Sequence, residues 1–226
     1  MSPSPKKFSL KNFLLQDEFT LITECKKASP SAGIIRSNYN PLEISKIYYS
    51  NGAKAISVLT DKDFFQGSIK DLELVSQKIP LPILRKDFII HEKQIYEASR
   101  FGASAILLIV RILKPNVLRF LLEKAYKIGL EVLVETHTIN EAKTALDNGA
   151  EIIGINTRDL DDFKIHPNLI KEISTYLPKN CIKVGESGIK NKSDLLEMKK
   201  FVNSALIGTY FMEKDDIDLA FKKLLN

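Results

Sequence analysis

Charged and amide side chains follow short apolar runs at several points along the chain. They are, in order, Glu24 and Lys26, Lys86, Glu135, Asn156 and Arg158, and Glu186. A lysine near a carbonyl substrate can act as an electrophilic acid, and a nearby carboxylate can act as a base. The alternative is an exposed ion pair at the end of a run, such as Lys86 with Asp87, which contributes little to stability. We interpret the repeated placement of these groups as a catalytic site.

Two glycine-containing pairs in the C-terminal half are suited to binding an anion. Ser187-Gly188 and Gly208-Thr209 each follow an apolar run. Glycine lets backbone N–H groups approach a phosphate closely, whereas the alternative is a turn without a ligand. The hydroxyl-rich turn at residues 29–33 is expected to shape the mouth of the same site. Phe64-Phe65 could stack on a planar part of a substrate or pack on their own helix.

Eight short apolar or β-branched runs are predicted to be strands. They cover residues 19–25, 55–60, 82–88, 105–110, 131–135, 152–156, 181–186 and 205–207. The segments between them show helical periodicity, for example at Leu118, Leu121 and Leu122. Glycine precedes several of the strands, as in Asn51-Gly52, at the point where helices commonly end. The chain is therefore predicted to repeat a strand–helix unit eight times.

Such a repeat forms either a closed (β/α)8 barrel or an open doubly wound sheet. We favour the barrel because no GxGxxG motif follows the first strand and because 226 residues suit one barrel. The prediction is a single α/β domain over residues 1–226, with an N-terminal extension at 1–18 and the barrel at 19–226. Active sites of barrels gather at the C-terminal ends of the strands, where the polar groups stand.

The alternation of side chains along a strand predicts which of these groups point into the barrel. Residues i and i+2 share a face, so Glu24 should continue the direction of Ile22, and Glu135 that of Leu133. The same rule places Lys86, Asn156 with Arg158, and Glu186 inside the barrel. It points Lys183 outward, toward the helices.

The composition is that of an ordinary globular protein, with 44% hydrophobic and 27% charged residues. The net charge of +5 is dispersed, which predicts no nucleic-acid partner. The N-terminus lacks the apolar region of a secretory signal and no run is long enough for a membrane span, so we expect a cytoplasmic protein without membrane contact.

Cys25 and Cys181 are expected to be buried thiols. His91, His137 and His166 form no HxH or HxxxH pair, so no metal site is predicted.

Together, these motifs resemble those of indole-3-glycerol phosphate synthase. They are Glu24-x-Lys26-x-x-Ser29-Pro30-Ser31, Ser57 to Asp61 with Phe65-Gln66-Gly67-Ser68, Leu84-Arg85-Lys86-Asp87-Phe88-Ile89, Gly154-Ile155-Asn156-Thr157-Arg158-Asp159-Leu160, Glu186-Ser187-Gly188-Ile189 and Leu206-Ile207-Gly208. The resemblance runs from about residue 20 to residue 213 in the family's order. It implies a carbon–carbon lyase (carboxy-lyase) of tryptophan biosynthesis. The family closes an indole ring on 1-(2-carboxyphenylamino)-1-deoxyribulose 5-phosphate, losing carbon dioxide and water without a cofactor or metal.

The resemblance also implies residue roles. Lys86 would be the general acid and Glu135 would handle protons, while Glu24 and Glu186 would tune the lysines and Lys26 would engage an anionic group. Asn156 and Arg158 would contact hydroxyls or the carboxylate of the substrate. The residues implied around the substrate's phosphate and its ring are Ser29, Ser187, Gly188, Gly208 and Thr209, and Phe65, Phe88, Leu107, Ile109 and Leu206. The protein is expected to be a monomer that could associate with other enzymes of the pathway.

Two features depart from the family pattern. The family usually has a longer segment before the first strand, including a helix over the active face, whereas only 23 residues precede Glu24. Residues 9–15 are expected to keep part of that lid. Thr209 replaces a serine or another small polar residue, which preserves the hydroxyl.

The alternative functions are another phosphate-binding barrel, such as phosphoribosylanthranilate isomerase, and a non-catalytic barrel that binds a partner. The isomerase would need a cysteine as acid or base, and Cys25 is predicted to face away from the barrel.

Overall fold

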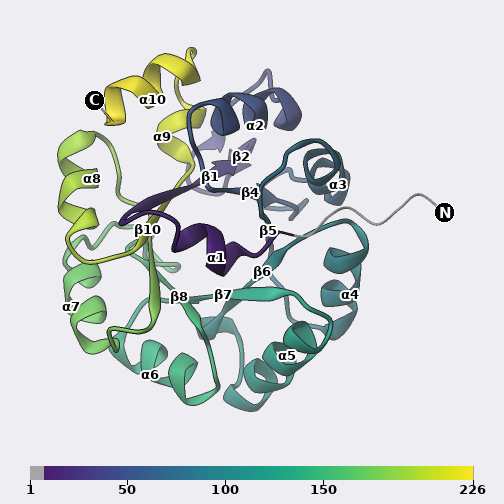
Figure 1. The fold of residues 1–226 in the computed structure, drawn as a ribbon, viewed down its shortest axis with the longest axis vertical. Coiled ribbons are helices and arrows are strands. Elements are labelled where there is room, and N and C mark those ends of the chain that lie inside the picture. Colours follow the sequence, from purple (N-terminus) through teal and green to yellow (C-terminus); the bar gives the residue numbers. More distant parts are fainter. Residues whose placement is uncertain (1–7, 226) are drawn as a thin grey trace.

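The computed structural model, which describes residues 8–225, has a closed barrel of eight parallel strands at its centre (Figure 1). Each strand pairs with its neighbours in chain order, and the last pairs with the first. The strands are β1 (Thr20–Cys25), β4 (Ala55–Leu59), β5 (Ile83–Lys86), β6 (Ala105–Ile109), β7 (Glu131–Thr136), β8 (Ile152–Asn156), β9 (Ile182–Glu186) and β10 (Ser204–Ile207). The eight predicted strands and the (β/α)8 barrel are confirmed, with strand ends within two residues of the prediction.

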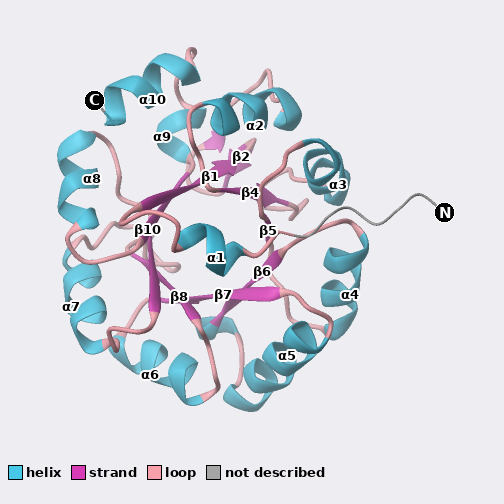
Figure 2. Cartoon of the chain, in the orientation of Figure 1, coloured by secondary structure: helices cyan, strands magenta, loops and turns pink. Residues whose placement is uncertain are grey.

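Helices surround the barrel on the outside (Figure 2). They are α2 (Pro41–Ser50), α3 (Ile69–Lys78), α4 (Glu92–Arg100), α5 (Pro115–Lys127), α6 (Ile139–Asp147), α7 (Asn168–Tyr176), α8 (Lys192–Lys199), the short α9 (Thr209–Met212) and α10 (Ile217–Leu225). The 3-10 helix η1 (Val110–Ile112) follows β6, and the small hairpin of β2 (Ala28–Ser29) and β3 (Gly33–Ile34) follows β1. Gly52 after α2 has a φ of 86°, a left-handed conformation that glycine adopts without strain and that ends the helix before β4.

The alternation along the strands separates two hydrophobic cores. One core lies between the barrel and the helices and includes Leu21 and Val134, whereas the other fills the barrel and includes Ile22 and Leu133. The predicted inward face is thereby confirmed for the residues within the strands. Arg158, which was predicted to point inward with Asn156, lies beyond the end of β8, where the alternation no longer applies, and its side chain bonds to its own loop. Cys25 lies in the outer core, with its Sγ 3.3 Å from Ser45 Oγ, as the alternation predicted.

Helix α1 (Leu10–Leu14) closes the N-terminal end of the barrel. Leu10 and Leu14 are fully buried in the interior core, and α1 lies at the centre of the ring in Figure 1. Ser9 Oγ donates a hydrogen bond of 2.7 Å to Glu131 Oε1, and Lys11 N donates one of 2.9 Å to Glu131 Oε2. Glu131 is the first residue of β7 and marks the end of the barrel opposite the strand ends that carry the predicted site.

The expectation that residues 9–15 form part of a lid over the active face is wrong. The chain enters the barrel through β1 at Thr20, soon after α1 ends at Leu14, and the start of β1 lies at the N-terminal end. The apolar side chains of α1 are therefore used to cover the near end of the barrel core. Residues 1–7, which are the first part of the predicted extension and on which the expectation about a secretory signal partly rests, lie outside the described residues.

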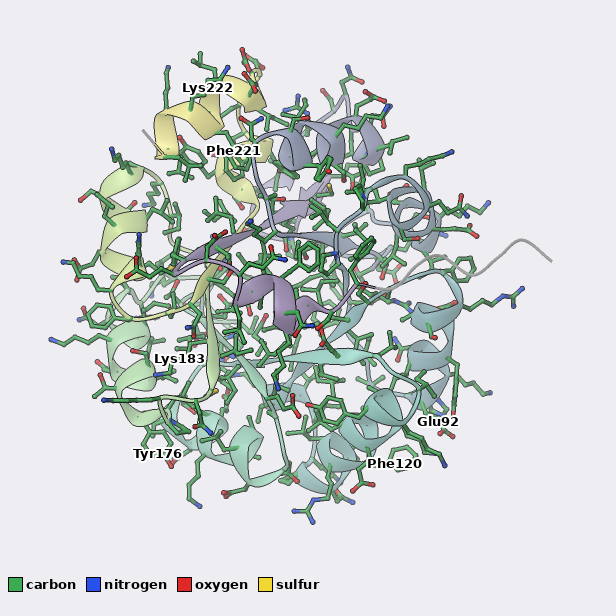
Figure 3. All side chains as sticks on the ribbon, in the orientation of Figure 1. Glu92, Phe120, Tyr176, Lys183, Phe221 and Lys222 are labelled. Carbon is green, nitrogen blue, oxygen red and sulfur yellow. The ribbon has the colours of Figure 1, made fainter. Side chains whose placement is uncertain are left out.

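The outward direction of Lys183 has a structural explanation. Its Nζ donates hydrogen bonds of 2.8 Å to Ser174 O and 3.3 Å to Leu177 O, at the C-terminal end of α7 (Figure 3). The last carbonyl groups of a helix lack partners within the helix, and a lysine supplies them. In the described part of the chain, no helix is long and apolar enough to cross a membrane.

Candidate active site

Four side chains form a charged layer at the C-terminal end of the barrel interior. Lys86 Nζ lies 2.7 Å from Glu186 Oε2, 3.5 Å from Glu135 Oε2 and 3.8 Å from Glu24 Oε2. The four residues come from β1, β5, β7 and β9, which are alternate strands of the barrel. Barrel interiors are filled in layers of four side chains supplied by alternate strands. The layer below, two residues earlier on each strand, is apolar and consists of Ile22, Leu84, Leu133 and Val184.

Glycines on neighbouring strands make room for the carboxylates of this layer. A Cβ atom at Gly154 of β8 would lie 2.1 Å from Glu186 Oε1, and one at Gly208 would lie 2.4 Å from Glu24 Oε1. Both distances are far shorter than a van der Waals contact. Gly154 and Gly208 therefore have a steric role in the charged layer, and sequence reasoning had assigned only Gly208 to the site.

Lys86 does not pair with its sequence neighbour Asp87. Asp87 Oδ2 instead accepts a 3.0 Å hydrogen bond from Arg85 Nη2, and Arg85 also contacts Glu97 at 2.7 Å. Arg85 points outward from β5 and Lys86 points inward, as the alternation along a strand requires. The ion pair of Lys86 with Asp87 that the sequence left open is thus absent among the described contacts, and Lys86 is free to face the three glutamates.

Lys26 joins the ends of the first and last strands. Its Nζ lies 3.2 Å from Glu24 Oε1 and donates a 2.9 Å hydrogen bond to Thr209 Oγ1. The Lys26 side chain is only 13% exposed, which excludes the exposed ion pair that was the alternative interpretation. Thr209 begins α9, and this helix is anchored by Phe211, whose ring stacks on that of Phe221 at 4.3 Å between centroids. Phe221 is labelled in Figure 3.

The loop after β9 has an unusual backbone. Ser187 has a φ of 67° and Gly188 one of 83°, so two successive residues adopt the left-handed conformation. This conformation is costly for serine and is common at functional sites. Ser187 Oγ donates a 2.8 Å hydrogen bond to Asn156 Oδ1, which links the ends of β8 and β9.

Two predicted site residues lie apart from the charged layer. The Arg158 guanidinium donates a 3.0 Å hydrogen bond to Phe163 O in its own loop, and only the Arg158 backbone N contacts Asn156. Ser29 Oγ accepts a 3.3 Å hydrogen bond from Ala32 N within its own turn. The structure thus brings together Glu24, Lys26, Lys86, Glu135, Asn156, Glu186, Ser187 and Thr209, and leaves Arg158 and Ser29 at the rim.

Aromatic and aliphatic side chains line one side of this region. The ring centroid of Phe88 lies 5.8 Å from that of Phe64 and 6.2 Å from that of Phe65. Phe88 also packs against the interior core, which contains Leu107, Ile109 and Leu206. Leu160 packs there too, although sequence reasoning had not assigned it to the site. An apolar wall beside a charged layer fits a substrate that has a ring and ionised groups.

The charges shift one another's protonation equilibria. Burial alone would raise the pKa of Glu135, but Lys86 and His137 lower it to about 2. Burial, together with Glu135 and Glu24, raises the pKa of Glu186 to about 7 against the opposing effect of Lys86. Burial alone would lower the pKa of Lys86, but the glutamates raise it well above its usual value. Carboxyl groups with such separated pKa values can act as acid and base at the same pH.

His137 is the main residue that sequence reasoning missed. It is 3% exposed, with Nε2 at 3.4 Å from Glu135 Oε1 and Nδ1 at 3.3 Å from Glu141 Oε2. His137 belongs to no histidine pair with metal-binding spacing, so the criterion applied to the histidines in the sequence does not single it out. A signal was present nonetheless, because His137 follows Glu135 by two residues and precedes Glu141 by four.

A closed (β/α)8 barrel whose acid–base groups lie at the C-terminal ends of its strands is a barrel enzyme by fold and site. The model of the indole-3-glycerol phosphate synthase family matches residues 2–224. The chain therefore belongs to the indole-3-glycerol phosphate synthase family, as its motifs predicted.

Curated relatives agree with this assignment. An indole-3-glycerol phosphate synthase of Leptospira interrogans is 58% identical over 216 residues, which are 96% of this chain and 86% of the relative. The enzyme of the same name from Aquifex aeolicus is 46% identical over 91% of this chain and 80% of the relative. Among solved structures, a designed cube-shaped protein cage made by fusing symmetric oligomeric domains matches with a TM-score of 0.64 over 92% of this chain and 70% of its own. At 17% identity, that match supports the fold alone.

Proposed function

We propose that the chain closes the indole ring of 1-(2-carboxyphenylamino)-1-deoxyribulose 5-phosphate, with loss of carbon dioxide and water, and so acts as a carboxy-lyase of tryptophan biosynthesis. The observation that carries the proposal is Lys86, an ammonium group held among three glutamates at the active end of a barrel of this family. The reaction needs a proton donor for a ketone and an acceptor for the protons released later, and the charged layer contains both.

Lys86 acts as the general acid. The ring carbon that bears the carboxylate attacks the ketone carbon of the deoxyribulose chain, and Lys86 gives a proton to the ketone oxygen. The aromatic carbon that made the attack then loses carbon dioxide, and the electrons of the broken bond restore the aromatic ring. The hydroxyl group leaves as water with a proton from the reprotonated Lys86, while Glu135 takes up the proton lost from the adjacent CH2 carbon. The low pKa of Glu135 keeps it ionised for this role. Glu24 and Glu186 hold and tune the lysines, which they contact at 2.7 to 3.8 Å.

The substrate's phosphate binds against the loops after β9 and β10. Ser187, Gly188, Gly208 and Thr209 line these loops, and the paired left-handed residues after β9 support an anion site there. Lys26 faces Thr209 and engages an anionic group, and Ser29 closes on the phosphate from the turn after β1. Arg158 must leave Phe163 O to reach the substrate, so we propose that it turns inward with Asn156 when the anthranilate carboxylate or the hydroxyls bind. Phe65, Phe88, Leu107, Ile109 and Leu206 surround the ring.

The residues of the proposed mechanism all belong to one chain. We therefore propose that residues 1–226 act as one catalytic domain, that a monomer is sufficient for activity, and that any association with other enzymes of the pathway is not needed for turnover. The two buried free thiols support the reducing environment of the cytoplasm as the site of action. Light scattering after size-exclusion chromatography of the active protein measures the oligomeric state.

The test is turnover of the proposed substrate. The purified protein is incubated with 1-(2-carboxyphenylamino)-1-deoxyribulose 5-phosphate, and indole fluorescence is followed with time. We expect fluorescence to rise and carbon dioxide to be released in equal amount. Absence of product at saturating substrate, with the protein shown to be folded by circular dichroism, would reject the proposed function.

A further inference from the structure

A second buried network lies behind Glu135, on the side away from Lys86. The two carboxylate oxygens of Glu135 face different partners, since Oε2 lies 3.5 Å from Lys86 Nζ and Oε1 lies 3.4 Å from His137 Nε2. The His137 side chain is 1% exposed, so water does not compete for these contacts. The proposed catalytic carboxylate is thus held from both sides.

The contacts of His137 define its charge. Its Nδ1 lies 3.3 Å from Glu141 Oε2, so both ring nitrogens face carboxylate oxygens. A neutral imidazole has a proton on only one nitrogen and would direct a lone pair at one of the carboxylates. The imidazolium presents an N–H to each carboxylate: Nδ1 is in hydrogen-bond contact with Glu141, whereas Nε2 makes an ion-pair contact with Glu135 without a hydrogen bond in this structure. Two opposite charges offset the cost of burying the imidazolium.

Glu141 is itself fixed in place. It lies in the first turn of α6, where the helix dipole favours a carboxylate, and the Glu141 backbone N donates to Thr138 Oγ1 at 3.1 Å. Its Oε2 also accepts a 2.7 Å hydrogen bond from His137 N. Arg111 of η1 contacts Glu141 Oε1 at 3.3 Å.

The network extends to the loop after β8. Arg111 Nη1 lies 3.2 Å from Asp159 Oδ2, next to Arg158. The charged groups around His137 are therefore Glu135 from β7, Glu141 from α6, Arg111 from η1, Asp159 from the loop after β8 and, beyond Glu135, Lys86 from β5. No residue of this chain of contacts other than Glu135 and Lys86 has a part in the proposed mechanism.

We infer that His137 is a positioning residue for ring closure, which holds Glu135 ionised and in one rotamer with Oε2 directed at Lys86, while Glu141 holds the imidazolium. The inference rests on the proposed function, because it assigns Glu135 the role of base. His137 need not touch the substrate. A change at His137 should therefore affect the rate of chemistry more than substrate binding.

The protonation equilibria agree with this geometry. Burial alone would lower the pKa of His137, but the nearby carboxylates of Glu135 and Glu141 raise it to about 9. Loss of the imidazolium removes one of the effects that keep the pKa of Glu135 at about 2, so the base would be less ionised in acid. The wild-type rate should also fall as the pH rises through about 9, where His137 loses its proton.

The first experiment compares His137→Phe and His137→Gln with the wild type. We expect the phenylalanine variant, which has no donor, to lose kcat on the order of 10- to 100-fold, the effect of one or two charge-assisted hydrogen bonds, with KM within about twofold. The glutamine variant keeps one N–H donor and should lose less. In both variants the acid limb of the pH profile of kcat should move to higher pH. The matched control is His166→Phe, because His166 is exposed and outside the network; its kinetics should equal those of the wild type.

The second experiment does not depend on turnover. Histidine resonances of the wild-type protein are titrated by NMR, and His137 should remain protonated to about pH 9. Glu141→Gln should lower that titration point and reduce kcat in the same direction as His137→Gln, and it serves in place of His137→Phe if that variant does not fold. If the wild type itself has no activity, the proposed function fails while the titration still decides the charge of His137.

Three results would overturn the inference. They are titration of His137 near its ordinary pKa of 6.5, kinetics of His137→Phe equal to those of the wild type, and equal losses in the phenylalanine and glutamine variants with unchanged pH profiles. The last result would show that His137 only fills space behind β7.

Discussion

Lys86 is the residue on which the proposed chemistry depends. The geometry around it is asymmetric, since Glu186 is in hydrogen-bond contact at 2.7 Å whereas Glu24 and Glu135 lie more than 3 Å away. A proton given up by Lys86 can therefore be replaced from Glu186, whose pKa of about 7 allows it to carry one near neutral pH. This exchange requires no movement of the barrel strands.

Replacing Lys86 tests its role as acid. Lys86→Met keeps much of the volume but removes the proton donor, so we expect kcat to fall by about 10²- to 10⁴-fold. Substrate binding, measured by calorimetry on the inactive variant, should change little because the acid acts in the transition state. Lys164→Met, at an exposed lysine, is the control and should keep full activity. A rise in KM without loss of kcat would contradict the assignment.

Substitution of Thr209 tests the proposed phosphate site. Thr209→Val keeps the shape of the side chain but removes the hydroxyl that binds Lys26 at 2.9 Å. We expect KM to rise about tenfold with kcat within a factor of about three, since the phosphate takes no part in bond making. Steady-state kinetics measure both constants, and Thr175→Val on the exposed face of α7 is the control. A loss confined to kcat would place Thr209 in the chemistry instead.

Helix α1 is an element whose role differs from the expectation. Its two leucines extend the interior core to the N-terminal end of the barrel, and Glu131 holds its first turn through Ser9 and Lys11. The charged layer lies at the other end. A substitution in α1 should therefore change the stability of the protein without changing its catalytic rate.

Truncation of a buried leucine of α1 measures its contribution. Leu14→Ala removes a fully buried side chain and should reduce the free energy of unfolding by about 2 to 4 kcal/mol, while kcat of the folded protein stays unchanged. Leu15→Ala is the control, because Leu15 is 54% exposed and its loss should cost less than about 0.5 kcal/mol. Urea unfolding gives both values. Equal effects of the two substitutions would show that α1 does not close the core.

The stability of the whole molecule should depend on pH through His137. A histidine whose pKa rises from 6.5 to about 9 on folding stabilises the folded state below pH 6.5, and this contribution is lost as the pH rises through 9. Between pH 7 and pH 9 the loss from this group is about 2 kcal/mol. Glu186, whose pKa is raised from 4.5 to about 7, lowers the stability as the pH rises from about 4.5 to 7; above pH 7 this loss is nearly complete, so Glu186 adds little to the change between pH 7 and pH 9.

Urea unfolding at pH 7, 8 and 9 measures the effect. The wild type and His166→Phe should both lose stability over this range, whereas His137→Phe should lose about 2 kcal/mol less. Only the change with pH is compared, because substitution of a buried histidine also shifts the stability at every pH. Parallel curves for the wild type and His137→Phe would contradict the prediction.

Local patterns in the sequence were sufficient for the strands, the barrel and the direction of the polar groups that lie within the strands. The period of two along a strand is a local property, so Glu24, Glu135 and Glu186 could be placed on the inward face without knowledge of their neighbours. The motifs around them were likewise sufficient for the family. Even Gly52 could be predicted at a helix end from its position before β4.

The contacts between strands were decided only by the tertiary structure. Closure of the barrel brings Lys86 within 4 Å of carboxylates that are distant in sequence. The position of α1 depended on which end of the barrel lacked a cover, and the charge of His137 depended on two carboxylates from different elements. Periodicity fixes the direction in which a side chain points, whereas its distance from other groups depends on how the strands are staggered and closed.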